Sequence, residues 1–325
     1  MNGLRETGAV AVGATKPVIV FYSQYDEPEA WRPLFEQHCP GWTFQVWPEV
    51  DDVDAVEVAL LWKPPAGMLN AFPRLRLIIN LGAGVDAILA DPHRPANVPL
   101  VRLNDPGMAT MMMQYVLYWA LHYHRNFPEF AQAQRQRRWH YIHPLPTRNT
   151  HIGLLGLGML GGFAAMELSR QGFTVSGWAR TLKQIDGVAT TDGARPGEAW
   201  LGTLDILVVL LPLTPQTRGL VDRTVLQALP RGAKLISVGR GAVVNEADLI
   251  EALRSGHLGG ATVDTCEHEP LPPEHPFWDT DNLTVTPHLA SVAVPESCMA
   301  QIVRDIGAVH AGQRPAHVVD PAAGY

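Results

Sequence analysis

Cysteine is scarce in this 325-residue sequence, which has only Cys39, Cys266 and Cys298, all far apart. An odd, widely spaced set does not form a disulfide framework, so we expect free thiols in a reducing compartment. Residues 1–16 lack an apolar stretch preceded by cations, and we therefore expect no signal peptide. These absences favour a cytoplasmic protein.

Long hydrophobic runs and long basic runs are also missing. The most apolar helix candidate, residues 108–123, contains Gln114 and His122 and is shorter than the ~20 apolar residues of a membrane span. It fits a buried helix or a subunit contact. The formal net charge is −7, and no basic cluster stands out. We therefore expect neither a membrane nor a nucleic acid as a partner.

Short apolar segments alternate with segments of helical periodicity over most of the chain. The expected strands cover residues 17–22, 43–47, 56–62, 76–81 and 99–103, and then 150–155, 174–178, 205–211, 233–238, 261–264 and 283–286. Continuous apolar strands separated by helices indicate parallel sheets covered on both faces. The length exceeds one hydrophobic core. The sequence therefore predicts an α/β protein with two doubly wound parallel-sheet domains.

Helices are expected between these strands. They cover residues 27–38, about 107–127, 245–256 and 295–312, the third with Asn245 as its N-cap and Gly256 at its end. The polar, arginine-rich residues 131–150 are predicted to form an extended connector between the two series.

The strongest local motif places Gly156, Gly158 and Gly161 between the apolar strand at 152–155 and a helical segment. Such glycines permit a tight turn and a close approach of the backbone to a pyrophosphate, which meets free N–H groups at the helix N-terminus. Because strand, helix and a second strand are all present, the motif predicts a Rossmann dinucleotide site rather than an ordinary glycine-rich turn.

The second strand of this unit ends without the acid that would bind the ribose 2′-hydroxyl of NAD. Ala179 takes the place of that acid, and Arg180, Thr181 and Lys183 follow it. A carboxylate would repel a 2′-phosphate, whereas arginine can bind it in a bidentate manner. This favours NADP(H), with NAD(H) as a possible second cofactor. Alternatively, Arg180 and Lys183 are ordinary solvated cations.

Three later strands each lead into a polar residue at their C-terminal side, where open α/β sheets bind ligands. Arg240 follows the first, Asp264 and Glu269 the second, and His288 the third. An arginine, a carboxylate and a histidine at one edge can bind an anion and move a proton. Each residue alone could be a surface or turn residue, but their order behind a dinucleotide motif favours a catalytic group.

The sequence resembles the D-isomer-specific 2-hydroxyacid dehydrogenase family over nearly its whole length. The resemblance rests on residues 82–86 (GAGVD), 156–162 (GLGMLGG), 211–217 (LPLTPQT), 237–253 (SVGRGAVVNEADLIEAL), 263–278 (VDTCEHEPLPPEHPFW) and 286–290 (TPHLA). It implies a flavodoxin-like substrate domain at 1–105 plus 292–325 and a Rossmann domain at 106–291. It also implies a homodimer.

By the same resemblance, Arg240, Glu269 and His288 form the catalytic triad, and Asp264 contacts the nicotinamide carboxamide. The substrate carboxylate would be held by the backbone of Gly82, Ala83, Gly84 and Val85. Trp139 would either reach the active site of the neighbouring subunit or have only an ordinary packing role. The implied cofactor contacts are Gly156, Gly158, Met159, Leu160, Arg180, Thr181, Lys183, Leu211, Pro212, Thr217, Val238, Gly239 and Asp264.

These residues predict a hydride-transfer reduction of small 2-keto acids, with glyoxylate and hydroxypyruvate first. Arg240 would polarise the keto group, and His288, whose charged form a neighbouring carboxylate favours, would supply the proton. A larger 2-keto acid such as phenylpyruvate is an alternative substrate, and a non-enzymatic dinucleotide-sensing scaffold is an alternative function. The spacing of Cys266, His268 and His275 matches no standard zinc pattern, so no metal is expected.

Overall fold

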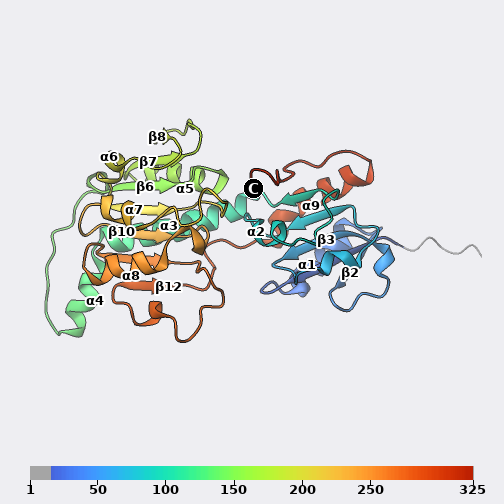
Figure 1. The fold of residues 1–325 in the computed structure, drawn as a ribbon, viewed down its shortest axis with the longest axis horizontal. Helices are drawn as coiled ribbons and strands as arrows, with labels where there is room; N and C mark the ends of the chain where they lie inside the picture. Colours follow the sequence, from blue (N-terminus) through green and yellow to red (C-terminus); the bar gives the residue numbers. More distant parts are fainter. Residues whose placement is uncertain (1–15, 325) are drawn as a thin grey trace, which may run out of the picture.

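The structure, a computed structural model, describes residues 16–324. It consists of two lobes that lie side by side, each built around one β-sheet (Figure 1). We call them the five-stranded half and the seven-stranded half. The expectation about a signal peptide concerns residues that, apart from Lys16, lie outside the described range.

The five-stranded half has a sheet in which all neighbouring strands run parallel, in the order β2-β1-β3-β4-β5. Its strands are β1 (Val18–Ser23), β2 (Thr43–Val46), β3 (Val56–Trp62), β4 (Leu77–Asn80) and β5 (Leu100–Arg102). Its helices are α1 (Pro28–His38), α2 (Asp86–Leu89) and α9 (Pro295–His310). This strand order is that of flavodoxin, which confirms the predicted flavodoxin-like fold.

The seven-stranded half has the parallel order β12-β11-β10-β9-β6-β7-β8. Its strands are β6 (His151–Leu155), β7 (Thr174–Ala179), β8 (Ala189–Asp192), β9 (Ile206–Val209), β10 (Lys234–Ser237), β11 (Gly260–Val263) and β12 (Leu283–Val285). Its helices are α3 (Pro106–His124), α4 (Phe127–Arg135), α5 (Met159–Arg170), α6 (Glu198–Leu201), α7 (Arg223–Ala228) and α8 (Glu246–Arg254). Counted from β6, this is the Rossmann order with one added strand, as predicted.

Short 3₁₀ helices complete the connections. They are η1 (Val53–Ala55), η2 (Met68–Ala71), η3 (Thr147–Asn149), η4 (Gly241–Val243) and η5 (Pro276–Asp279).

The strands are apolar throughout because both faces of each sheet are covered. In β3, for example, Val58 and Leu60 pack into one buried cluster with α1 and α9, while Ala59 and Leu61 pack into another on the opposite face. Such two-sided burial explains why the strands read as continuous apolar runs rather than as alternating patterns.

Helix α3 takes part in the cores of both halves. Met108 near its start packs with the strands of the five-stranded half, whereas Met112 and Val116 pack into the seven-stranded half. The helix begins after Asp105, whose Oδ2 accepts a hydrogen bond from the Met108 N–H at 3.0 Å. The predicted buried helix is confirmed. Within residues 16–324, a helix with the length and apolarity needed to cross a membrane is absent.

The segment that follows α3 differs from the prediction. Helix α4 includes residues 131–135, so the prediction of an extended connector is wrong for that part. Alanine, glutamine and arginine favour helix here, and Ala133 is buried. The chain turns between α3 and α4 at Asn126, which has a left-handed φ of 57°. A long helix through residue 127 is therefore also wrong.

Strand β8 is not predicted from the sequence. Its residues ATTD include no large apolar side chain, and they pair at the edge of the sheet, where three of the four are exposed. An edge strand buries too little surface to leave an apolar pattern. By contrast, the Asn245 cap of α8 is confirmed, since its Oδ1 accepts from the Asp248 N–H at 3.0 Å.

Candidate active site

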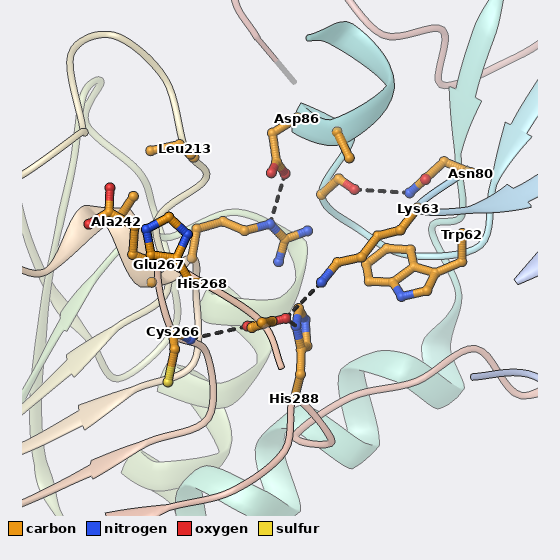
Figure 2. Close-up of a pocket in the computed structure, with 15 residues that line it drawn as sticks. Trp62, Lys63, Asn80, Asp86, Leu213, Ala242, Cys266, Glu267, His268 and His288 are labelled. Carbon is orange, nitrogen blue, oxygen red and sulfur yellow. Dashed lines mark hydrogen bonds and ion pairs between the residues drawn. The ribbon is translucent and has the colours of Figure 1, made fainter. Parts of the chain in front are cut away.

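The C-terminal ends of strands from both sheets face a pocket of about 320 Å³ between the two halves (Figure 2). The five-stranded half contributes residues that follow β3 and β4, and the seven-stranded half contributes residues that follow β10, β11 and β12. The residues used below from this lining are Trp62, Lys63, Asn80, Gly84, Asp86, Arg240, Cys266, Glu267, Glu269 and His288. Both doubly wound sheets therefore place their ligand-binding edges at one site.

Arg240, Glu269 and His288 come together in this pocket, as expected from the sequence. The Nδ1 atom of His288 lies 2.8 Å from Oε2 of Glu269. Because an ionised carboxylate can only accept, Nδ1 donates its proton to Glu269. The Nε2 atom is then the ring nitrogen left to exchange a proton with a ligand. Both side chains are largely buried.

Glu269 accepts hydrogen bonds from three directions. Besides His288, the Nζ of Lys63 donates to Oε2 at 2.7 Å, and the Cys266 N–H donates to Oε1 at 3.1 Å. Burial alone would raise the pKa of Glu269, but the hydrogen bonds and charges of His288 and Lys63 outweigh it and lower that pKa to about 2. The carboxylate is therefore ionised at any pH near neutrality.

Arg240 is held at several points of its guanidinium group. Its Nε donates to Oδ1 of Asp86 at 2.8 Å, and its Nη1 donates to the Gly239 carbonyl at 3.0 Å. Its Nη2 lies so close to Gly84 that a Cβ there would be only 1.6 Å away. Position 84 therefore has to be glycine for the guanidinium to lie where it does.

Trp62 forms one wall of the pocket. Its ring meets the His288 ring edge-on at 5.8 Å between centroids, and the Arg240 guanidinium carbon lies 5.9 Å from the indole centroid. A Cβ at position 82 would be 2.1 Å from the indole, so Gly82 leaves the space that this ring fills. The two glycines of the GAG sequence thus accommodate two different side chains.

The loop of Gly82, Ala83, Gly84 and Val85 is shaped by Asn80. The Asn80 Nδ2 donates to the carbonyls of Gly82 and Gly84 at 2.7 and 3.0 Å. Among residues 16–324, no atom accepts a hydrogen bond from the N–H groups of these four loop residues. Unpaired N–H groups beside an arginine suit an anionic ligand.

Asp264 is almost completely buried and organises the His288 loop. Its Oδ1 accepts from the Thr286 hydroxyl and the Leu289 N–H, and its Oδ2 accepts from the Ala290 N–H at 2.9 Å. The His288 N–H donates to the Asp264 carbonyl at 2.8 Å, which helps hold His288 at a left-handed φ of 55°. A carboxylate has about four acceptor positions, so one remains for a further donor.

The glycine motif has the geometry that a dinucleotide requires. Gly156 has a φ of 102°, and a Cβ at Gly161 would lie 2.0 Å from the Gly156 carbonyl oxygen. A Cβ at Gly158, in contrast, would meet no atom within 4 Å, so a ligand can approach there. Gly158, Met159 and Leu160 begin α5 and present its first N–H groups, as a pyrophosphate site needs.

The other expected cofactor segments lie beside this turn. Leu211 packs between Gly156 and Gly239. A Cβ on either glycine would clash with Leu211 or with the residue before it. Thr217 donates to the Pro212 carbonyl at 2.6 Å and so closes the loop after β9. Val238, directly after β10, is buried next to Gly239.

Arg180, Thr181 and Lys183 lie together in the loop after β7, and all three are exposed. Ala179, the last residue of β7, is buried. The structure therefore places two cations, and no acid, directly after the second Rossmann strand.

Trp139 is the expected site residue that the structure does not bring to the pocket. It lies in the connector after α4 and is 98% exposed. No group of three His, Cys, Asp or Glu side chains in the described part of the chain could hold a metal ion. His275 instead lies 3.2 Å from Glu246, and burial together with nearby carboxylates raises the pKa of Cys266 to about 12.

Sequence reasoning missed Lys63, Asp86, Trp62 and Asn80. One signal was available: Trp62, Lys63 and Asn80 end or follow apolar strands, which is the criterion that identified Arg240 and His288. The partners of Lys63 and Asp86, however, lie in the other half, 206 and 154 residues away along the chain. Only the fold shows that these strand ends face the triad.

Comparison with known proteins identifies the class. Residues 117–290 match the family model described as D-isomer specific 2-hydroxyacid dehydrogenase, NAD binding domain. The chain belongs to this family and is an NAD(P)-dependent oxidoreductase. The expected resemblance is thus confirmed.

Two individual relatives share one name within this family. The chain is 42% identical over 312 residues to glyoxylate/hydroxypyruvate reductase A of Serratia proteamaculans (strain 568), covering 94% of this chain and 99% of that one. A protein of the same name from Yersinia enterocolitica is 39% identical, again over 94% of this chain and 99% of its own.

Solved structures agree with this assignment. A D-isomer specific 2-hydroxyacid dehydrogenase from Xanthobacter autotrophicus Py2, in complex with NADPH and MES, matches with a TM-score of 0.90 and 47% identity over 95% of this chain and 100% of that one. An NADPH-dependent glyoxylate/hydroxypyruvate reductase from Sinorhizobium meliloti, in complex with NADP and sulfate, matches with a TM-score of 0.88 and 34% identity over the same shares.

Proposed function

We propose that this enzyme reduces small 2-keto acids, glyoxylate and hydroxypyruvate first, with NADPH as the preferred reductant. The observation that carries the proposal is the convergence on one pocket of Arg240, the His288–Glu269 pair and Gly84, which belongs to the loop with unpaired N–H groups. These groups can bind a carboxylate, polarise a keto oxygen and deliver a proton. The names of the relatives support the same reaction.

The residues present fit NADP(H). The turn at Gly156 and the open space at Gly158 suit a pyrophosphate, and the loop after β7 offers Arg180, Thr181 and Lys183 to a 2′-phosphate. NADH would lack that phosphate contact and serve less well. When bound, the nicotinamide supplies the hydride for reduction. Asp264, with one acceptor position left, would hold its carboxamide.

Arg240 would bind the substrate by its carboxylate and keto oxygen. The loop N–H groups from Gly82 to Val85 would share the carboxylate, which fixes the keto carbon in the pocket. A positive charge beside the keto oxygen stabilises the negative charge that develops there, and it does so more strongly in a pocket that excludes water.

His288 would supply the proton. Its Nδ1–H bond to Glu269 leaves Nε2 to carry the proton toward the substrate oxygen. Glu269 is ionised and lies against Nδ1, so its negative charge stabilises the imidazole in the form that donates the proton.

Pocket size supports a small substrate. The volume of about 320 Å³ is at the lower end of the ~300–1,000 Å³ that is usual for ligand sites. The nicotinamide ring would fill part of it, and the Trp62 wall limits the remainder. A keto acid with a large side chain, such as phenylpyruvate, would fit poorly.

A panel of 2-keto acids tests this proposal. Glyoxylate, hydroxypyruvate, pyruvate and phenylpyruvate are assayed with NADPH and with NADH by the loss of nicotinamide absorbance. We expect the highest kcat/KM for glyoxylate or hydroxypyruvate with NADPH. Turnover of none would overturn the enzymatic function, and a preference for phenylpyruvate would overturn the substrate class.

The cofactor preference has its own test. Arg180→Ala should lower the NADPH-to-NADH ratio of kcat/KM roughly 10- to 100-fold, because a charged hydrogen bond contributes about 1.5–3 kcal/mol. Arg170→Ala, in the exposed pair with Glu167 on α5, is the matched control and should leave the ratio unchanged. An unchanged NADPH-to-NADH ratio in Arg180→Ala would mean that residues other than Arg180 bind the 2′-phosphate.

We also propose a cytoplasmic homodimer. The three cysteines are free, and apolar side chains are exposed on α3, on α4 and in the connector, including Tyr118, Phe127, Trp139 and Tyr141. A second copy covering this surface would bury them, and Trp139 would approach the partner's pocket. Light scattering on the purified protein should give twice the monomer mass; a monomer at micromolar concentration would contradict the dimer.

A further inference from the structure

Two ion pairs join the two halves, and each of them includes one member of the triad. Lys63 pairs with Glu269 at 2.7 Å, and Asp86 pairs with Arg240 at 2.8 Å. The other ion pairs of the described residues lie within one half. Charged side chains of the five-stranded half are thus directed specifically at the triad.

The contact of Asp86 with Arg240 leaves part of the guanidinium available. Asp86 takes Nε and the Gly239 carbonyl takes Nη1, while Nη2 lies beside Gly84, in the loop whose N–H groups are unpaired. A ligand carboxylate that reaches Nη2 from the pocket would not need to displace Asp86 from Nε. Asp86 begins α2 directly after Val85, so its carboxylate is attached immediately next to that loop.

We propose that Asp86 is a positioning residue that holds Arg240 in the orientation in which it binds and polarises the substrate. This inference rests on the proposed function. An arginine side chain has four rotatable bonds, and a misplacement of about 1 Å in a catalytic group can cost on the order of 100-fold in rate. Asp86 restricts the rotation of the Arg240 side chain. Because Asp86 is attached next to the 82–85 loop, the guanidinium and that loop keep a constant relative position.

Steady-state kinetics provide the first test. Asp86→Ala should lower kcat/KM for glyoxylate between about 10-fold and 100-fold and leave the Kd for NADPH unchanged. Asp86→Asn, which keeps an acceptor oxygen, should lose less. Glu167→Ala is the matched control, because it also removes a carboxylate from an arginine, Arg170, but at a position on α5 outside the pocket lining. It should stay close to wild type.

Rescue by a small carboxylate separates positioning from general destabilisation. Formate can occupy the space of the missing Asp86 carboxylate, so it should raise kcat of Asp86→Ala while it inhibits the wild type. Glu167→Ala should respond like the wild type. A variant that had merely lost its fold would not regain activity with formate.

Chemical modification gives a readout that needs no turnover. Phenylglyoxal should modify Arg240 several-fold faster in Asp86→Ala than in the wild type, with the site mapped by mass spectrometry. Glu167→Ala should speed the modification of Arg170 and leave that of Arg240 unchanged, which checks the method within the same protein.

The outcomes separate the two proposals. A wild type that reduces no keto acid overturns the proposed function, and the modification rates then still decide whether Asp86 holds Arg240. A wild type that is active, with Asp86→Ala of equal kcat/KM, overturns the positioning role alone. A lower KM and higher kcat/KM in Asp86→Ala would mean that Asp86 competes with the substrate, which also overturns it.

Discussion

Replacement of Glu269 by glutamine should lower stability in a pH-dependent way. The folded protein holds the pKa of Glu269 at about 2, against an ordinary value of 4.5. At about 1.4 kcal/mol per unit, the difference corresponds to about 3 kcal/mol of stabilisation at pH 7. For a chain of 325 residues that amounts to a decrease in Tm of about 4–5 °C.

The pH dependence of this effect follows from the direction of the shift. Because folding lowers the pKa, the stabilisation is complete above the unfolded value of 4.5 and is lost as the pH falls toward 2. Thermal unfolding followed by circular dichroism at pH 5, pH 4 and pH 3 should therefore show a Tm difference that is largest at about pH 5. The difference should shrink steadily below that pH.

A matched control makes the measurement specific. Glu267→Gln removes a carboxylate from an exposed pair in the same loop and should change stability by less than about 1 kcal/mol. A Glu269→Gln variant with the wild-type Tm at pH 7, or with a Tm difference that persists unchanged at pH 3, would refute the reasoning.

Three further predictions concern activity and cofactor binding. His288→Ala should nearly abolish reduction but retain NADPH binding, measured by nicotinamide fluorescence; loss of binding would mean that its role is misassigned. Gly84→Ala should reduce kcat/KM strongly, because its Cβ would lie 1.6 Å from Nη2 of Arg240; wild-type kinetics would place the guanidinium elsewhere. Gly161→Ala should lower the Tm, since its Cβ would lie 2.0 Å from a backbone carbonyl oxygen, whereas Gly158→Ala should keep the Tm and weaken NADPH binding. Equal effects of the two substitutions would argue against a pyrophosphate at this turn.

The sequence was most informative where burial leaves a strong pattern. Strands covered on both faces read as apolar runs, and Arg240 and His288 stand out as polar residues directly after them. The edge strand β8 left no such pattern because it buries little. Helix α4 was missed because its polar composition resembles that of a connector.

Contacts between the halves could not be read from the chain at all. Asp86 follows a glycine-rich loop, and nothing local shows that it faces Arg240, 154 residues away. The glycines at 82 and 84 were assigned to a substrate loop, yet their lack of a Cβ is also required by Trp62 and Arg240. Such requirements arise only when two sheets are brought edge to edge.

The ion pairs of Lys63 and Asp86 also constrain when the chemistry can occur. Both side chains are attached to one half, and both partners to the other, so any movement that separates the halves breaks both pairs at once (Figure 2). Arg240 then loses the Asp86 carboxylate, and Glu269 loses the Lys63 ammonium group. The three triad residues all lie in the seven-stranded half, so such a movement would keep the His288–Glu269 pair and would remove only the charges and the 82–85 loop that complete the site around it.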